Sequence, residues 1–154
     1  MAPRASSACR DNIFASYILG LDAPDLAYSN LIQVIKSKSA AGFVPNFAAG
    51  LSRSDDRTEP PIGAKVLLEL YKKWQDEWVI ELLFDDLLDW SNWFVQRRLL
   101  PPARLVALGS TGGMHAARLE SGLDDSVRPR HAAPSVRPHC IRVLTDRSQP
   151  LVHG

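Results

Sequence analysis

The chain has 154 residues, of which 45% are hydrophobic and 23% charged, a balance typical of a globular protein with one core. Its formal charge of +1 argues against nucleic acid as the main partner, because binding to phosphates needs an excess of Lys and Arg. No stretch approaches the roughly 20 apolar residues that span a bilayer, and the first residues lack the apolar run of a secretory signal. We therefore expect no membrane contact and, as the sequence is written, a cytoplasmic protein.

The charge is unevenly distributed along the chain. Residues 127–154 hold five Arg and one Asp, which leaves 13 basic and 16 acidic residues in 1–126. Proline is scattered among Arg and His in this basic tail, and apolar periodicity is nearly absent. Such a segment buries too little apolar surface to offset its ordering entropy. The sequence thus predicts a disordered start over 1–10, a folded part over 11–126, and a disordered tail over 127–154.

The first half of the folded part predicts two helices. The apolar run over 12–21 predicts a buried helix that ends near Gly20. Apolar residues then recur at helical spacing, which predicts an amphipathic helix over 23–38. Asp22 is the expected N-cap of this helix, and Pro24 is expected in its first turn.

A long loop is expected to separate these helices from a second pair. Residues 40–61 show no periodicity, and loops of this length in compact domains are usually functional or disordered. Helical periodicity returns over 62–74 and again over about 77–98, where a Leu-Leu-Pro-Pro stretch ends the second helix. A loop containing Gly109 and a helical turn near 114–119 follow. Because no clear β alternation occurs, the predicted fold class is all-α.

Three clusters of polar residues fall in the predicted loops. Asp11 belongs to the first, Asn46, Arg57 and Glu59 to the second, and Asp124 to the third, an ESGLDDS stretch. Each cluster has a structural interpretation. Asp11 suits a helix N-cap, and Asn46 and Arg57 suit a loop tied down by backbone hydrogen bonds. Asp124, two residues after a glycine, suits an Asx turn.

Other chemically notable residues are expected to be structural. The two cysteines, Cys9 and Cys140, form one disulfide or none, and no metal-ligand spacing is present. We expect no metal and no cofactor. Trp90 and Trp93 could stack on sugars, but their helical spacing places them in the predicted core.

The order of the three clusters resembles that of the (α/α)6-barrel glycosidases, the clan that contains glycoside hydrolase family 63 and the trehalases of family 37. Those families carry, in this order, WD-x-x-F, G-x-x-PN, R-[ST]-x-PP, a Trp-rich helical hairpin and ESG-x-D-x-S. This chain has DNIF, GFVPN, RTEPP, DWSNWF and ESGLDDS in the same order, over roughly residues 10–126. RTEPP and ESGLDDS favour family 63, the mannosyl-oligosaccharide glucosidase-like group, over the trehalases, whose usual motifs are SRSQPP and ESGWD.

The resemblance implies an inverting, exo-acting hydrolase of α-linked glucose in oligosaccharides, on a partial (α/α)6 barrel. Asp124 would be the general acid, a role that requires a raised pKa. Asp11, Asn46, Arg57 and Glu59 would hold sugar hydroxyls in the terminal subsite. The implied partner is an oligosaccharide substrate.

The chain departs from the family pattern at both ends. An inverting glycosidase needs a second carboxylate about 6.5–9.5 Å from the acid, and in this clan that base lies far downstream of Asp124. Nothing in 127–154 resembles the family, and a change of reading frame near residue 126 would explain this abrupt change of composition. At the other end, Cys9-Arg10 stand where an aromatic residue usually precedes Asp11. We therefore expect an inactive or very weak barrel fragment with an exposed apolar face. The alternative is a non-catalytic helical protein, either a sugar-binding remnant or an interaction module.

Overall fold

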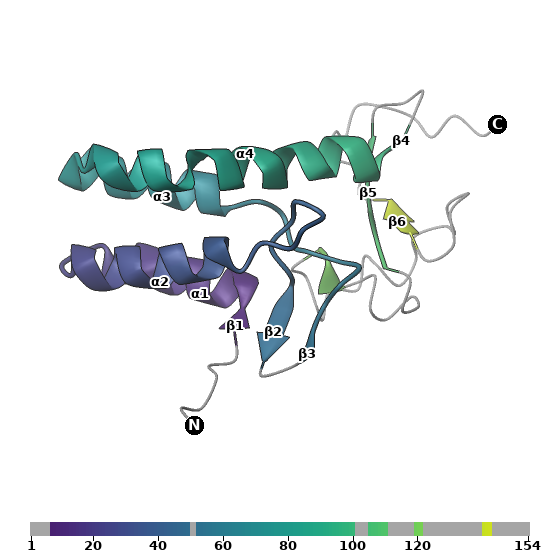
Figure 1. The fold of residues 1–154 in the computed structure, drawn as a ribbon, viewed down its shortest axis with the longest axis horizontal. Helices are drawn as coiled ribbons and strands as arrows, with labels where there is room; N and C mark the ends of the chain where they lie inside the picture. Colours follow the sequence, from purple (N-terminus) through teal and green to yellow (C-terminus); the bar gives the residue numbers. More distant parts are fainter. Residues whose placement is uncertain (1–6, 50–51, 101–104, 111–118, 122–139, 143–154) are drawn as a thin grey trace.

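The computed structural model describes residues 7–49, 52–100, 105–110, 119–121 and 140–142 (Figure 1). Within these ranges, four helices form two antiparallel hairpins, and short strands lie at one end of the helices. The prediction of a mainly helical protein is confirmed. None of the described helices combines the length and the apolar character that crossing a membrane requires.

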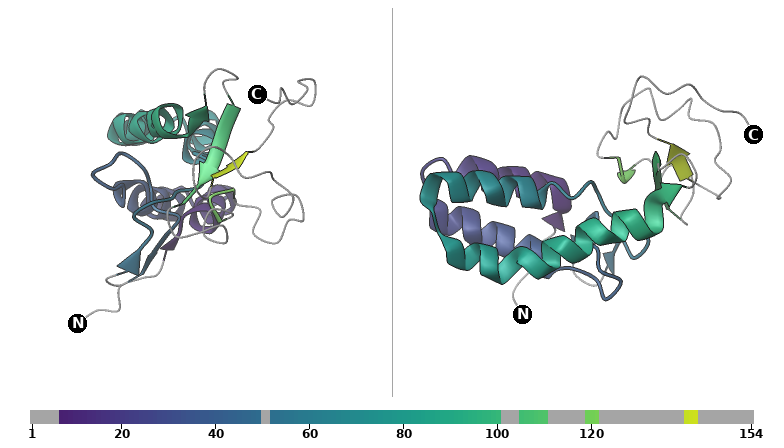
Figure 2. Two further views of the ribbon diagram at one scale, coloured as in Figure 1. Left: turned by 90° about the vertical axis from the view of Figure 1, so that its right-hand side faces the viewer. Right: turned by 90° about the horizontal axis from the view of Figure 1, so that it is seen from above.

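The two helical hairpins form two layers. The helices are α1 (Cys9–Leu19), α2 (Pro24–Lys36), α3 (Gly63–Trp74) and α4 (Glu77–Arg98). In Figure 1 the α3–α4 hairpin lies above the α1–α2 hairpin. Figure 2 shows that α1 packs under α3, and α2 under α4.

Apolar side chains from all four helices fill the space between the layers. Complete burial of one Val, Leu, Ile or Phe side chain contributes about 1.5–3 kcal/mol to stability. The indole N–H of Trp74 donates to the carbonyl oxygen of Gly20 at 2.9 Å, which joins the turns of the two hairpins. The largest fully buried apolar side chains are those of Ile13, Leu31, Ile35, Phe43, Val44, Val79, Leu83 and Trp90.

The first helix begins three residues earlier than the sequence predicts. The backbone N–H of Cys9 donates to the carbonyl oxygen of Asn46 at 3.1 Å. The next N–H, of Arg10, donates to Glu59 Oε2 at 2.7 Å. These distant acceptors satisfy donors that a helix leaves open at its N-terminus, so the helix extends to Cys9. Residues 7–10, expected to be disordered, are therefore part of the folded structure.

The other helices keep closer to their predicted bounds. The N-cap of α2 is Ala23 rather than Asp22, and no side chain caps the helix, whereas Pro24 in the first turn is confirmed. α3 ends where Gln75 adopts a left-handed φ of 60°. α4 covers the predicted range 77–98.

Short antiparallel strands, which the sequence did not predict, lie beside the helix ends. They are two to five residues long, too short to show a recognisable alternation. One sheet has the order β1-β2-β3, the other the order β4-β5-β6. The strands are β1 (Ser7–Ala8), β2 (Phe47–Ala49), β3 (Ser52–Arg53), β4 (Leu99–Leu100), β5 (Leu105–Gly109) and β6 (Cys140–Arg142).

Strand β6 corrects the prediction for the tail. Disorder was expected over 127–154, yet Cys140–Arg142 pair with β5, itself expected to be a loop, with Leu108 opposite Ile141. Backbone hydrogen bonds hold this ladder, and they leave no periodic signal in so short a segment. The rest of the tail, and residues 114–118 of the predicted helical turn, lie outside the described residues.

Candidate functional site

The predicted loop clusters meet where α1 and α3 begin and α2 ends, beside the last turns of α4 (Figure 1). The backbone N–H of Asn46 donates to the carbonyl oxygen of Arg57 at 3.3 Å, and the Asn46 carbonyl accepts from Cys9. The side-chain amide of Asn46 donates to the carbonyl oxygen of Leu119 at 3.5 Å. Segments distant in sequence are thus joined into one region, the loop cluster, which consists of residues 9–10, 42–46, 56–61 and 119–121.

Glu120, the first residue of the ESG stretch, is the centre of the loop cluster. Its side chain is fully buried, and its two carboxylate oxygens accept four hydrogen bonds. Arg98 Nε lies 2.7 Å from Oε2 and Arg98 Nη2 lies 2.9 Å from Oε1. The backbone N–H groups of Thr58 and Gly109 donate at 3.1 and 2.5 Å. Burial raises the pKa of Glu120, while Arg98 and the two N–H groups act in the opposite direction.

Arg98 extends this network to the surrounding backbone. Its Nη2 donates to the carbonyl oxygens of Asp56 and Gly109, each at 3.1 Å. Its guanidinium carbon lies 4.5 Å from the ring centroid of Trp93, a cation–π arrangement. One side chain at the end of α4 therefore holds the RTEPP loop, strand β5 and the ESG stretch together.

Thr58 anchors the RTEPP loop to the core. Its hydroxyl donates to the carbonyl oxygen of Val44 and accepts from the indole N–H of Trp90 at 2.8 Å. Thr58 and Trp90 are both fully buried, and Trp93 is 7% exposed. The prediction that both tryptophans belong to the core is confirmed, so neither indole offers a face to a sugar.

Arg57 lies at the open side of the same loop, with its side chain 20% exposed. Its Nη1 contacts Asp56 Oδ1 at 3.1 Å, and the other oxygen of Asp56 accepts from the Ser110 hydroxyl at 2.6 Å. Arg57 Nε is buried and has no hydrogen-bond partner among the described residues. A buried donor without a partner costs about 1–3 kcal/mol.

Glu59 serves the start of α1 in this structure. It is 4% exposed, and its Oε2 receives the Arg10 N–H described above. It also lies near Cys9, a free and buried thiol. Burial raises the pKa of that thiol far above its ordinary range, and the charge of Glu59 adds to the rise. A thiol with a raised pKa is a poor nucleophile, so Cys9 is a core residue here.

Asp11 lies apart from this network. Its side chain is 70% exposed, in the first turn of α1, and its Oδ1 is 3.4 Å from Arg10 Nε. The helix begins two residues before it, so the N-cap interpretation is wrong. Asn46, in contrast, ties loops together through its backbone and side chain, as its structural interpretation predicted.

The proposed general acid, Asp124, lies outside the described residues, which end at Ser121 in this stretch. Glu120 precedes Asp124 by four residues, and its carboxylate accepts four hydrogen bonds. No group of three or more His, Cys, Asp or Glu side chains among the described residues is placed to hold a metal ion.

The sequence interpretation missed Glu120 and Arg98 as organising residues. Both residues stand at recognisable places in the sequence, since Glu120 opens the ESG stretch and Arg98 is the last residue of the predicted helix over 77–98. Nothing in the spacing, however, pairs two residues that are 22 positions apart and belong to different segments.

Comparison with known protein families, with curated proteins and with solved structures finds no match to this chain.

Proposed function

We propose that the loop cluster is the terminal sugar subsite of a glycosidase-type domain, in which the two helical hairpins are part of an (α/α)6 barrel. In this proposal Asp124 is the general acid, and Asp11, Asn46, Arg57 and Glu59 surround the terminal glucose unit. The substrate is an oligosaccharide with α-linked glucose at its end, cleaved with inversion.

The observation that carries the proposal is the meeting of three motif segments at Glu120. The GFVPN and RTEPP stretches and the start of ESGLDDS are far apart in sequence, yet they are joined by hydrogen bonds of Asn46, Thr58 and Glu120. Functional residues in such domains are carried by loops that a rigid scaffold positions. The buried Arg98–Glu120 pair is a scaffold of that kind.

The polar groups at the open side of the loop cluster suit a sugar. The guanidinium group of Arg57, whose side chain is 20% exposed, is a donor for a hydroxyl oxygen, and the carboxylates of Asp56 and Asp11 are acceptors for hydroxyl protons. Sugar hydroxyls both donate and accept, so a mixed set of this kind can hold vicinal diols.

A binding titration with mutants tests the subsite. D-glucose and maltose would be titrated into the full chain and followed by NMR and calorimetry. We expect Arg57→Ala and Asp11→Ala to weaken sugar binding at least about tenfold, a loss of about 1.4 kcal/mol. Arg53→Ala is the matched control, because Arg53 is exposed on β3, outside the loop cluster, and pairs with the exposed Asp55 at 2.6 Å. Absence of sugar binding, or binding that Arg57→Ala leaves unchanged, would contradict the proposal.

Hydrolysis is tested separately from binding. It needs a second carboxylate about 6.5–9.5 Å from the acid, and we expect α-glucoside turnover by this chain to be absent or very slow. If turnover is found, Asp124→Asn should abolish it and leave sugar binding in place. If the wild-type chain and Asp124→Asn both bind sugar and neither hydrolyses it, the protein is a non-catalytic sugar-binding domain.

A second candidate function is an interaction module. It is favoured by the apolar outer face of the α3–α4 hairpin, where Phe84 is 57% exposed and Leu68 and Leu88 are each 46% exposed. Exposed apolar patches of this kind mark interaction surfaces.

A further inference from the structure

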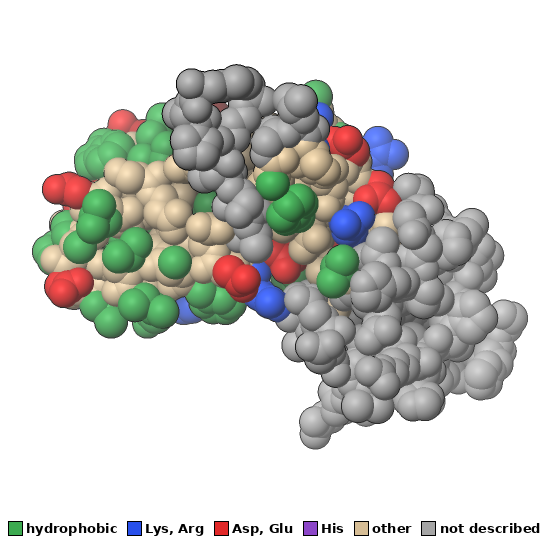
Figure 3. All heavy atoms as spheres, turned by 90° about the horizontal axis from the view of Figure 1, so that it is seen from below, with side chains coloured by type: hydrophobic (Ala, Val, Ile, Leu, Met, Phe, Trp, Pro, Cys, Tyr) green, Lys and Arg blue, Asp and Glu red, His purple; other side chains and the backbone are tan. Residues whose placement is uncertain are grey.

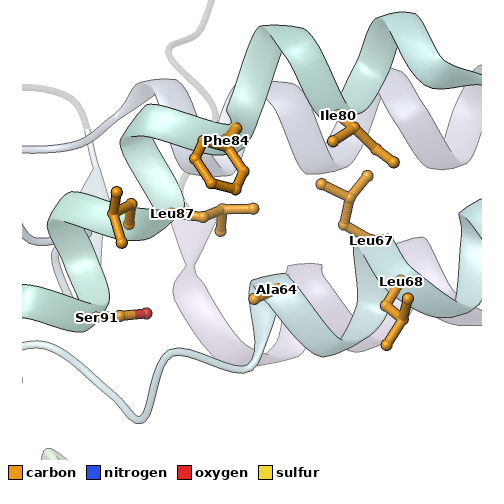
Figure 4. A pocket seen from close by; sticks show the side chains of 8 residues that line it. Ala64, Leu67, Leu68, Ile80, Phe84, Leu87 and Ser91 are labelled. Atoms are coloured by element: carbon orange, nitrogen blue, oxygen red, sulfur yellow. The ribbon is translucent and has the colours of Figure 1, made fainter.

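An apolar groove runs along the outer side of the α3–α4 hairpin, away from the loop cluster. It encloses about 360 Å³. Figure 4 shows the side chains of α3 and α4 converging on it from both helices, with little polar surface between them. Its lining residues are Ala64, Leu67, Leu68, Ile80, Phe84, Leu87, Leu88 and Ser91.

The two banks of the groove carry opposite charge. On α3, Lys65 and Lys72 lie three residues before and four residues after the lining residue Leu68, so helical spacing places them beside the groove. They share Glu69, at 2.5 and 3.1 Å, and these three side chains carry a net charge of +1. On α4, the exposed Glu81 and Asp85 lie three residues before the lining residues Phe84 and Leu88, which places them beside the groove on the other bank. Neither makes an ion pair within the part of the chain that the structure describes.

The charged residues lie level with one another across the hairpin. A Cβ atom placed on Gly63 would lie 3.1 Å from Leu87 and 3.4 Å from Trp90, so the start of α3 lies beside this part of α4. Lys72 follows Gly63 by nine residues, and Glu81 precedes Trp90 by nine residues. Because the helices are antiparallel, Lys72 and Glu81 sit at the same height on opposite banks.

From this arrangement we infer that the groove is the contact surface for a second copy of this chain. The two copies would pack face to face about a two-fold axis that runs along the hairpin. This operation places α3 of each protomer over α4 of the other, at the same height along the axis. Leu68, Phe84 and Leu88 of each copy then cover the other copy's groove.

Charge selects this orientation. With α3 over the partner's α4, each basic bank faces an acidic bank, and the contact repeats twice because a two-fold interface is isologous. The other face-to-face arrangement, with the axis across the hairpin, places α3 over α3 and α4 over α4, so like charges would meet. The second copy is therefore the complementary occupant for this groove.

The oligomeric state of the full chain tests the inference. Light scattering after size exclusion should give twice the 17.0 kDa of the chain at high concentration, with dissociation on dilution. The double variant Phe84→Asp/Leu88→Asp should be monomeric and remain helical, because both side chains are exposed. Ile18→Asp is the control. It adds a charge to α1, in the α1–α2 layer, where Ile18 is 64% exposed. Figure 3 shows that the outer face of this layer also carries hydrophobic side chains.

A charge exchange tests the orientation. Lys72→Glu and Glu81→Lys should each weaken the homodimer at least about tenfold, because two like-charge contacts arise per dimer. An equimolar mixture of the two variants should restore a dimer of mixed composition, and so should the double variant Lys72→Glu/Glu81→Lys. A monomeric wild-type chain, polydisperse aggregates, or a dimer that Ile18→Asp disrupts and Phe84→Asp/Leu88→Asp does not, would overturn the inference. Failure of the mixture to restore the dimer would overturn the orientation.

Discussion

Arg98 and Glu120 form a buried, two-pronged ion pair, with Nε 2.7 Å from Oε2 and Nη2 2.9 Å from Oε1. Arg98 ends the longest helix, and Glu120 begins the stretch that leads to Asp124. Two backbone N–H groups complete the carboxylate's set of donors. The pair therefore fixes where the chain enters the segment that carries the proposed general acid.

Removal of Arg98 should be among the most damaging single changes in the molecule. Arg98→Ala leaves the Glu120 carboxylate buried without its counter-charge, and we expect a loss of about 3–5 kcal/mol of unfolding free energy. Urea denaturation followed by circular dichroism measures it. Arg97→Ala is the control, because Arg97, the residue before Arg98, is exposed. For this variant we expect the unfolding free energy to change by no more than about 0.5 kcal/mol. Equal effects of the two substitutions would contradict a structural role for the ion pair.

Thr58→Val should expose the dependence of the core on one hydroxyl group. The substitution keeps the side-chain shape but leaves the indole N–H of Trp90 without its acceptor, at a cost of about 1–3 kcal/mol. The indole N–H resonance of Trp90 in an NMR spectrum should shift or broaden. Thr58→Ser keeps the hydroxyl and should keep the resonance near its wild-type position. If Thr58→Val left that resonance in place, the hydrogen bond would not exist in solution.

Asp86 should make stability depend on pH in the acid range. It accepts from Lys36 at 2.7 Å and from Lys38 at 2.8 Å, which joins the end of α2 to α4. Burial opposes ionisation, but the two ammonium groups prevail and lower the pKa of Asp86 below its ordinary value of 3.8. Since the folded-state pKa is the lower one, the stabilising contribution is complete above the unfolded-state pKa and is lost as the pH falls through the folded-state pKa.

Denaturation curves at a series of pH values measure this contribution. Asp86→Asn should be less stable than the wild type near neutral pH, and the difference should shrink in acid. Lys38→Met, which removes one of the two ammonium groups, should reduce the same difference. A wild-type and an Asp86→Asn profile that run parallel from neutral pH into acid would refute the assignment.

Gly20→Ala should be destabilising because the turn between α1 and α2 touches α3. A Cβ atom on Gly20 would clash with Leu70 Cδ2, and Leu70 is buried. Overpacking of this kind costs about 1–3 kcal/mol. In a double-mutant cycle measured by thermal denaturation, the cost should fall when Leu70→Ala removes the clashing carbon. Additive effects would show that the two residues do not meet.

The helices were the part of the fold that the sequence predicted best. α4 was predicted over its full length and α3 within a residue of its start, because both carry strong apolar periodicity and end at Gln75-Asp76 or Leu-Leu-Pro-Pro. The start of α1 was missed, because its open N–H groups are satisfied by Asn46 and Glu59, which are remote in sequence. The strands were missed for a related reason, since each is stabilised by a partner strand rather than by a pattern of its own.

For the candidate site, the sequence identified the segments but not their architecture. Asn46, Arg57 and Glu59 do lie in one region, whereas Asp11 faces solvent beside it. Arg57 and Glu59 are two residues apart, but their surroundings differ. Glu59 is buried at the start of α1, whereas the Arg57 side chain is 20% exposed and its Nε has no hydrogen-bond partner among the described residues.

By itself, the sequence determined the helical character of the chain, the approximate extent of the helices and the order of the polar clusters, because periodicity and turn residues act locally. Only the tertiary structure decided that Glu120 and Arg98 join Asn46 in holding the loop cluster together. It also decided that Leu68, Phe84 and Leu88 remain exposed around a groove with oppositely charged banks. Both features depend on which helix faces pack against each other, and this packing depends on the contacts of all core residues together.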